Sequence, residues 1–324
     1  LLEFSFDLEV EQDSNGRYVE FGRGVWSAVY KAKTRWIPHS SLLTPPPSPA
    51  TPSRVLAVKT PLRRDAAPVL AAEARILTRL AATAQADQHV VPFHGFVPAS
   101  CSLVMSAIPL ALSSHIEETA LLAKQNFSTR TMLEPVLTMP AWKDLAAQLI
   151  TGLDWLHTQA GVVHGDIKPH NILLLLRRRP DADPSTSSFQ YSALFADFSS
   201  AHDIHLNSNN NGSTAALSAV TPPFAAPELM TVAAMKSSSP LSTPSSDVFS
   251  LALTLLAAAT GDLLLYPGTS GMQRLAMARE GYRVLDFVRA GPHASRIPRG
   301  GVVESVVVPA VVRDARERVT AGEW

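Results

Sequence analysis

Apolar residues recur along the chain with two different periods, and the period changes after the first third. In residues 55–60 (V-L-A-V-K-T) the alternation predicts a strand with Ala57 and Lys59 on one face. Residues 68–82 instead carry leucines at helical spacing around Glu73, which predicts a helix. The early part of the chain therefore reads as strands followed by one amphipathic helix.

The later part of the chain has the helical period. Leucines repeat near helical spacing from residue 142 to residue 157, and residues 248–259 are apolar almost all round, as in a buried helix. We expect the polar stretch 236–246 between them to be a loop. Strands early and helices late predict an α+β fold with two lobes.

Three polar stretches interrupt these periods and set the expected boundaries. The stretch near 38–53 is rich in proline, which can neither donate to a sheet nor continue a helix. The stretches near 177–190 and 206–219 offer few apolar residues that could anchor them. We expect the first to be an insertion in an N-terminal lobe (residues 1–108) and the others to be insertions in a C-terminal lobe (residues 109–324).

Composition excludes several classes of protein. Of the 324 residues, 28 Lys and Arg balance 28 Asp and Glu, so no basic excess favours binding to nucleic acid or to a membrane. The longest apolar run, residues 248–260, is broken by Ser250 and Thr254 and is too short to cross a bilayer. Cys101 is the single cysteine, so no internal disulfide can form, which suits the cytosol or nucleus.

Two features of the early part could act on phosphate. In F-G-R-G-V-W-S-A-V, Gly22 and Gly24 leave backbone N–H groups bare for phosphate oxygens. Lys59 lies in an otherwise apolar strand, where an ammonium requires an anion, and Glu73 on the next helix is the natural partner. A plain glycine hairpin, a surface lysine and a solvated glutamate would explain each feature taken alone.

The strongest chemical signal is a pair of segments, V-H-G-D-I-K-P-H-N-I-L-L and F-A-D-F-S. Asp166, Asn171 five positions later and Asp197 after a further strand supply one base and two oxygen ligands of the kind that magnesium prefers. Lys168 adds a cation that offsets charge on a transferring phosphoryl group. These polar residues interrupt apolar runs, so the pattern favours chemistry over a purely structural role.

With these motifs in this order, the chain resembles the serine/threonine type of eukaryotic protein kinase over nearly its whole length. The resemblance implies a two-lobed protein-kinase-like fold, with a small β-rich N-lobe and a larger helical C-lobe. It also implies ATP and Mg²⁺ as cofactors, and transfer of the γ-phosphate to a Ser or Thr hydroxyl of a protein substrate. The positions that match family motifs are Gly22, Gly24, Lys59, Glu73, His164, Asp166, Lys168, Asn171, Asp197, Phe198, Ala226, Pro227, Glu228, Asp247 and Arg318.

The resemblance assigns roles to the catalytic and metal-binding positions. Asp166 would orient the substrate hydroxyl and accept its proton, and Lys168 belongs to the same catalytic loop. Asn171 and Asp197 would hold magnesium, and Lys59 would hold the α- and β-phosphates.

The resemblance also implies an adenine site and a segment that binds the substrate. Met105 would be the gatekeeper, and the positions facing or sandwiching adenine would be Val29, Ala57, Ser106, Ile108 and Leu173. Thr221 in T-P-P-F-A-A-P-E matches the serine/threonine branch, with spacing closest to that of cyclin-dependent-like kinases. Glu228 would pair with Arg318, and Asp247 would open the central helix of the large lobe.

Three substitutions depart from the family pattern. Ser27 replaces the third glycine of the loop, and Ser199 replaces the glycine after Phe198, which predicts a stiffer magnesium loop. Gly165 replaces the arginine that usually grips a phosphorylated activation loop. We therefore expect the polar segment 207–214 to be ordered by a regulatory protein subunit or to remain mobile.

Two alternative functions stay open. H-G-D-x-x-x-x-N, with Gly165 in it, is also the motif of aminoglycoside and choline phosphotransferases, although the T-P-P-F-A-A-P-E segment and Asp247 weigh against that class. A pseudokinase that binds or scaffolds without turnover is the second alternative, because Gly165 and Ser199 depart from the active pattern, whereas the catalytic and metal-binding positions are intact.

Overall fold

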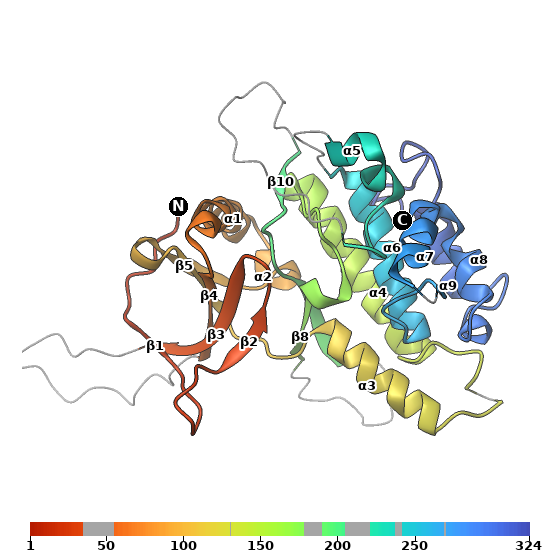
Figure 1. The fold of residues 1–324 in the computed structure, drawn as a ribbon, viewed down its shortest axis with the longest axis horizontal. Helices are drawn as coiled ribbons and strands as arrows, with labels where there is room; N and C mark the ends of the chain where they lie inside the picture. The colour runs from red at the N-terminus through yellow and green to blue at the C-terminus, as the bar shows by residue number, and fades with distance from the viewer. Residues whose placement is uncertain (35–54, 130, 178–189, 205–220, 237–241, 269) are drawn as a thin grey trace, which may run out of the picture. The chain divides into compact units, whose positions relative to one another are not determined.

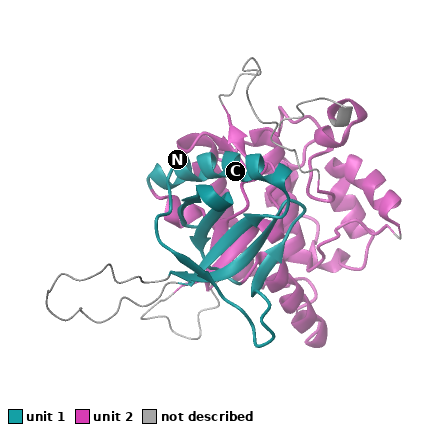
Figure 2. Cartoon of the chain, turned by 60° about the vertical axis from the view of Figure 1, so that its left-hand side comes forward, with its two compact units in different colours: residues 1–84, 91–109 teal, residues 85–90, 110–324 magenta. Residues whose placement is uncertain are grey.

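The structure is a computed structural model in which seven ranges of residues are described. These are residues 1–34, 55–129, 131–177, 190–204, 221–236, 242–268 and 270–324. The insertions expected near 38–53, 177–190 and 206–219, and the segment 207–214, lie wholly or almost wholly outside the described residues. The chain divides into two compact units, residues 1–84 with 91–109 and residues 85–90 with 110–324 (Figure 2).

Unit 1 is built on one antiparallel sheet, seen in red and orange in Figure 1. The strand order is β1-β3-β4-β6-β5, and β2 pairs with the first half of β3, at residues 28–30. The strands are β1 (Leu8–Val10), β2 (Glu20–Arg23), β3 (Ser27–Thr34), β4 (Val55–Pro61), β5 (Phe93–Val97) and β6 (Ser102–Ser106). The strand expected at 55–60 is thus confirmed as β4, in the middle of the sheet.

Helix α1 (Ala67–Ala82) packs against β5 and matches the helix expected over 68–82. Pro68 suits the first turn, where its missing N–H has no intrahelical partner to lose. Leu70, Ala74 and Leu77 are buried on one face, and Glu73 is buried with them. The buried face of α1 therefore contains the Glu73 carboxylate as well as the apolar side chains that pack on the sheet.

Unit 2 is mainly helical and contains two short antiparallel strand pairs, β8 with β9 and β7 with β10. The strands are β7 (Val162–Val163), β8 (Ile172–Leu176), β9 (Tyr191–Phe195) and β10 (His202–Asp203). The helices are α2 (Ala86–His89), α3 (Leu112–Gln125), α4 (Met139–Asp154), α5 (Val232–Lys236), α6 (Pro244–Thr260), α7 (Gly271–Arg279), α8 (Val284–Arg289) and α9 (Val302–Val307).

Helix α6 forms the core of unit 2. Every residue from Ser246 to Thr260 is buried, as the apolar run predicted, and α4 packs against it with the Trp142 indole N–H donating to the Leu255 carbonyl at 2.8 Å. The loop expected over 236–246 is wrong at its end, because α6 already begins at Pro244. Thr243 and Ser246 form a capping box there, which starts the helix earlier than the proline and serines suggested.

Helix α4 also ends earlier than expected. The leucine repeat up to residue 157 is continued after Asp154 by one π-helical turn, Trp155–Gln159. Among the described residues, none of the helices combines the length and apolar character that crossing a membrane would require.

Candidate active site

Unit 1 buries a lysine and a glutamate as an ion pair. Lys59 Nζ, on β4, lies 2.8 and 2.7 Å from the two carboxylate oxygens of Glu73 on α1. The side chains are 7% and 1% exposed, respectively. Burying either charge alone would be costly, so each side chain makes the other tolerable inside unit 1. The pairing suggested by the sequence is therefore present, and it fixes the direction of the Lys59 side chain.

The two loop glycines lie at the end of β2 and in the turn that follows. The backbone N–H of Gly24 donates to the Ser27 carbonyl at 2.8 Å, which closes the turn into β3. A Cβ at Gly22 would meet nothing within 4 Å, and at Gly24 only the Ser27 carbonyl oxygen, at 3.8 Å. Packing within the described residues thus does not require glycine at either position. Close approach of a ligand to the backbone would explain glycine at both positions.

Five of the expected adenine-site residues lie in unit 1, in neighbouring strands or just after them. Ala57 of β4 is paired with Met105 of β6, and Val29 of β3 is paired with Lys59. Ser106 ends β6, and Ile108 is buried two residues later. Leu173 belongs to β8 in unit 2.

In unit 2 three side chains converge on the carboxylate of Asp166. Lys168 Nζ lies 2.6 Å from Oδ2, Asn171 Nδ2 donates to Oδ2 at 3.1 Å, and the Thr221 hydroxyl donates to Oδ1 at 3.0 Å. Lys168 also donates to the Thr221 hydroxyl oxygen at 3.3 Å. Thr221 thus shares one hydrogen-bonded cluster with Asp166 and Lys168, which lie 55 and 53 positions before it in the sequence.

Burial sets the proton affinity of this carboxylate. Asp166 is 9% exposed, and burial raises the pKa of its carboxyl above the ordinary aspartate value, against the lowering effect of the Lys168 ammonium. The nearby charge of Asp197 raises the pKa of Asp166 further. A carboxylate held in this way is a better proton acceptor than a solvated one.

Asp197 and Asn171 are tied together through the backbone. The Ala196 N–H donates to the Asn171 carbonyl at 2.9 Å, and the next residue, Asp197, has φ 61°. Phe198 is buried, with its ring centroid 4.8 Å from that of His164, whose Nε2 lies 3.1 Å from the Ala196 carbonyl. The Asp197 backbone is thus placed next to the segment that carries Asn171.

These two residues are the candidate ligands for a metal. Asn171 donates through its amide nitrogen, to the backbone oxygen of Asp166 at 2.8 Å as well as to its carboxylate, so the amide oxygen is the atom suited to a cation. Within the described ranges, His, Cys, Asp and Glu side chains do not gather in threes as a self-sufficient metal site would require. One carboxylate and one amide oxygen fit magnesium that takes its other ligands from phosphates and water.

Asp247, at the start of α6, holds the backbone ahead of Asp166. Its carboxylate accepts the N–H of His164 at 2.7 Å and the N–H of Gly165 at 2.9 Å, and His157 Nε2 lies 3.1 Å away. Asp247 is 1% exposed. A buried carboxylate with several N–H donors is a rigid anchor, and His157 is a part of it that sequence reasoning missed.

Gly165 has a structural reason that the sequence did not reveal. Its φ is 81°, and a Cβ would lie 2.7 Å from the Ser200 carbonyl oxygen and 2.9 Å from the Ser242 hydroxyl. Both distances are shorter than a real contact allows, and positive φ further disfavours a side chain. The backbone at position 165 thus requires glycine, which is a structural reason for the replacement of the arginine found in the family pattern.

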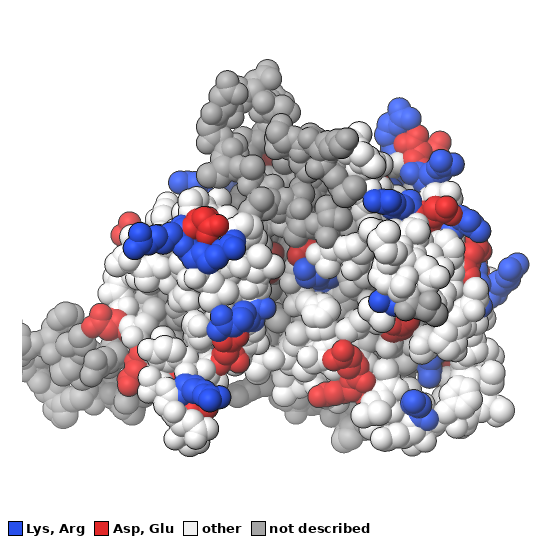
Figure 3. All heavy atoms as spheres, viewed as in Figure 1, with Lys and Arg blue, Asp and Glu red and all other residues white. Residues whose placement is uncertain are grey.

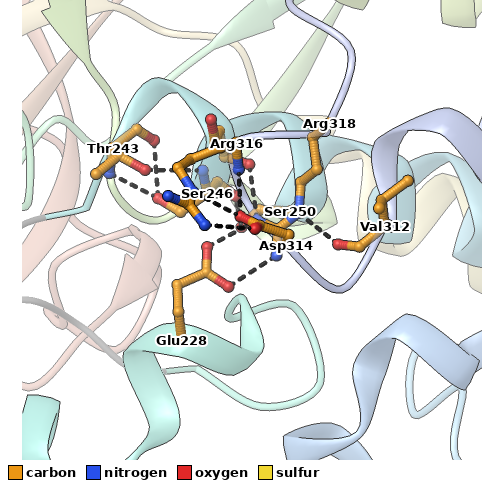
Figure 4. Close-up of polar contacts among 9 residues, drawn as sticks. Glu228, Thr243, Ser246, Ser250, Val312, Asp314, Arg316 and Arg318 are labelled. Atoms are coloured by element: carbon orange, nitrogen blue, oxygen red, sulfur yellow. Dashed lines mark hydrogen bonds and ion pairs between the residues drawn. The ribbon is translucent and has the colours of Figure 1, made fainter.

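The segment that contains Thr221 is fixed at its other end by Glu228. Arg318 is fully buried and forms a two-pronged contact with Glu228, at 2.7 and 2.8 Å (Figure 4). The same guanidinium donates to the carbonyls of Val312 and Ser245 at 3.0 and 3.1 Å. The planar guanidinium suits this bidentate geometry, which ties the segment to the end of the chain.

Comparisons with known proteins agree with this geometry. A family model described as "Protein kinase domain" matches residues 55–322. "Serine/threonine-protein kinase SRPK" of Physarum polycephalum is 42% identical over 45 residues, which cover 14% of this chain and 11% of the relative. "SRSF protein kinase 3" of Homo sapiens and of Mus musculus is 50% identical over 38 residues, which cover 12% of this chain and 7% of each relative. The chain thus matches about a tenth of these relatives' own length.

Proposed function

From the premise that the chain belongs to the protein kinase family, we propose that it transfers the γ-phosphate of ATP to a serine or threonine hydroxyl of a protein substrate. The observation that carries the proposal is the cluster on Asp166, where a buried carboxylate with a raised pKa contacts Lys168, Asn171 and Thr221. Asp166 orients the substrate hydroxyl and accepts its proton. Lys168 offsets the charge that develops on the transferring phosphoryl group.

Other residues of the two units take the supporting roles. Lys59, directed by Glu73, binds the α- and β-phosphates, and the bare backbone at Gly22 and Gly24 approaches phosphate oxygens. Asn171 and Asp197 would hold Mg²⁺, which would neutralise phosphate charge. Positioning and electrostatic stabilisation then supply most of the rate enhancement.

The Thr221 contacts favour a protein substrate over a small molecule. Thr221 donates to Asp166, and the segment that follows it is anchored by Glu228 on Arg318. A fixed chain segment next to the base would align an extended peptide, whereas a small-molecule phosphotransferase has no use for it. Two relatives carry names of serine/threonine or SRSF kinases, which supports the same choice of acceptor.

The test is phosphate transfer from γ-labelled ATP with Mg²⁺ to a mixed protein substrate, followed by phosphoamino-acid analysis. We expect label on phosphoserine and phosphothreonine and none on phosphotyrosine. Label on tyrosine would contradict the Ser/Thr assignment. A thermal shift with ATP and Mg²⁺ but no transfer to any protein would instead favour the pseudokinase alternative.

A further inference from the structure

Unit 2 contains a hollow beside the C-terminal end of α3, away from the residues that surround Asp166. We call it the α3 pocket, and it encloses about 220 Å³. This is below the roughly 300–1,000 Å³ of sites that take drug-sized ligands, so the pocket fits a side chain rather than a nucleotide. The lining residues include Thr119, Leu122, Ala123, Glu134, Val136 and Arg296.

A buried cation lines this pocket with most of its donors unused. Arg296 is 9% exposed, and burial lowers the pKa of its guanidinium. One nitrogen, Nη1, donates to the Glu134 backbone carbonyl at 2.7 Å. This is its side-chain hydrogen bond among the described residues, and none of its nitrogens is both buried and unpaired, so the remaining N–H groups are open to solvent. A largely covered guanidinium with open donors can form a bidentate pair with an anionic group that enters the pocket.

The wall opposite α3 is fixed by the core. The Val136 N–H donates to the Ala259 carbonyl of α6 at 2.9 Å. Gly261, with φ 79°, ends α6 so close to α3 that a Cβ would lie 2.7 Å from the Ala120 side chain. Both contacts hold the pocket against the buried helix, so its shape does not depend on a ligand.

Large apolar side chains are exposed beside the pocket. Leu122 on α3 is 55% exposed, and Phe127 and Leu133 after the helix are 59% and 53% exposed. Leu122 itself lines the pocket. Several exposed large apolar residues along one short stretch are typical of a surface that another chain covers.

We propose that the α3 pocket docks an extended segment of a protein partner in which an Asp or Glu carboxylate lies next to aliphatic residues. The carboxylate forms a bidentate pair with Arg296, and the aliphatic residues cover Leu122. Glu134 also lines the pocket, and its negative charge disfavours a phosphate dianion relative to a singly charged carboxylate. On the face drawn in Figure 3, basic and acidic side chains are interspersed, so the described residues there form no field that would attract a polyanion.

The role of the docked segment rests on the proposed kinase function, because the partner is then a substrate or regulator. Ala111, directly before α3, bridges to Leu173 of β8, whereas the pocket lies at the other end of the helix. The 14 residues of α3 span about 20 Å. An extended chain covers at most about 3.5 Å per residue, so about six residues are needed to reach from the pocket to the start of α3.

The experiment is selection of a random twelve-residue phage-displayed peptide library on the full chain, followed by fluorescence-anisotropy titration of the selected peptides. We expect peptides with Asp or Glu next to Leu, Ile, Val or Phe. Their affinity should fall at least tenfold with Arg296→Met and with Ala123→Glu, which places a carboxylate in the pocket wall. Arg299→Met, an exposed arginine three positions away, is the matched control and should bind as the wild type does.

Ala123→Glu keeps Arg296 and its bond to Glu134, so it separates lost docking from lost folding. Selected peptides without a carboxylate, or equal binding to all four proteins, would overturn the proposal. Transfer of phosphate to a short substrate without the motif should be unchanged in the three variants. Should the wild type transfer no phosphate while the peptides still require Arg296, the kinase function fails and the docking site stands.

Discussion

Two ion pairs near the end of the chain have almost the same length but differ in burial, and they should differ in energy. Arg318 and Glu228 approach to 2.7 Å with side chains 0% and 34% exposed. Arg316 and Asp314 approach to 2.8 Å with side chains 89% and 38% exposed (Figure 4). We choose Glu228→Gln and Asp314→Asn as the matched perturbations, because each removes one negative charge and keeps the shape of the side chain.

The expected magnitudes follow from what each change leaves behind. Glu228→Gln leaves the Arg318 guanidinium buried over the Phe249 ring, 5.0 Å from its centroid, with two carbonyl acceptors but without its ion-pair partner. Breaking a fully buried pair costs about 3–5 kcal/mol, and the partial exposure of Glu228 reduces our expectation to about 2–3 kcal/mol. Asp314→Asn breaks a solvated pair, whose attraction water and salt screen, so its loss should change the free energy of unfolding far less.

Urea unfolding followed by tryptophan fluorescence measures both changes, since Trp142, Trp155 and Trp324 lie in unit 2 with these pairs. A double-mutant cycle with Arg318→Met should give a coupling of about 2 kcal/mol, and a cycle of Asp314→Asn with Arg316→Met should give a much smaller one. Equal losses for the two pairs would refute the reasoning that burial, rather than distance, decides their contribution.

Four further outcomes follow from the site. Because Asp166 must be ionised to accept a proton and burial raises its pKa, the acid limb of the kcat/KM profile should lie above the ordinary aspartate range; a limb at that range would contradict the burial argument. The same raised pKa lowers stability as pH rises from the ordinary aspartate value to the raised one, so over that interval the stability of Asp166→Asn relative to the wild type should increase and then stay constant at higher pH, as measured by urea unfolding. Gly165→Ala should lower both the Tm and phosphate transfer, because its Cβ would meet the Ser200 carbonyl; an unchanged Tm would show that the loop has room. Thr221→Val should lower kcat about tenfold, as one hydrogen bond to the base is lost, with little change in the KM for ATP; an unchanged kcat would remove Thr221 from the mechanism.

The parts of the fold that the sequence could predict are those whose signal is local. The alternation around Lys59 indicates a strand, and the leucine spacing around Glu73 indicates a helix. Because a buried lysine requires a carboxylate, the ion pair between Lys59 and Glu73 could be predicted from these two signals. The Arg318 contact with Glu228 was expected only from the resemblance to the protein kinase family. The start of α6 was misplaced because proline and serine were taken as loop residues, although Thr243 and Ser246 also fit a capping box.

The parts that could not be predicted depend on contacts between distant residues. The need for glycine at position 165 comes from Ser200 and Ser242, which approach it only in the folded chain. Arg296 likewise carries no motif, and its burial next to the α3 pocket results from the packing of α3 and the loop after it. Such features come from tertiary structure, which periodicity and spacing do not contain.

The central claim is that this chain catalyses phosphate transfer with Asp166 as its base. The most direct measurement compares label incorporated from γ-labelled ATP by the wild type, by Asp166→Asn and by Asp286→Asn, a control at an aspartate whose side chain is 65% exposed. We predict incorporation by the wild type and by Asp286→Asn, and a loss of at least a hundredfold in Asp166→Asn with its fold intact. Equal incorporation by all three proteins, or none by the wild type, would contradict the account.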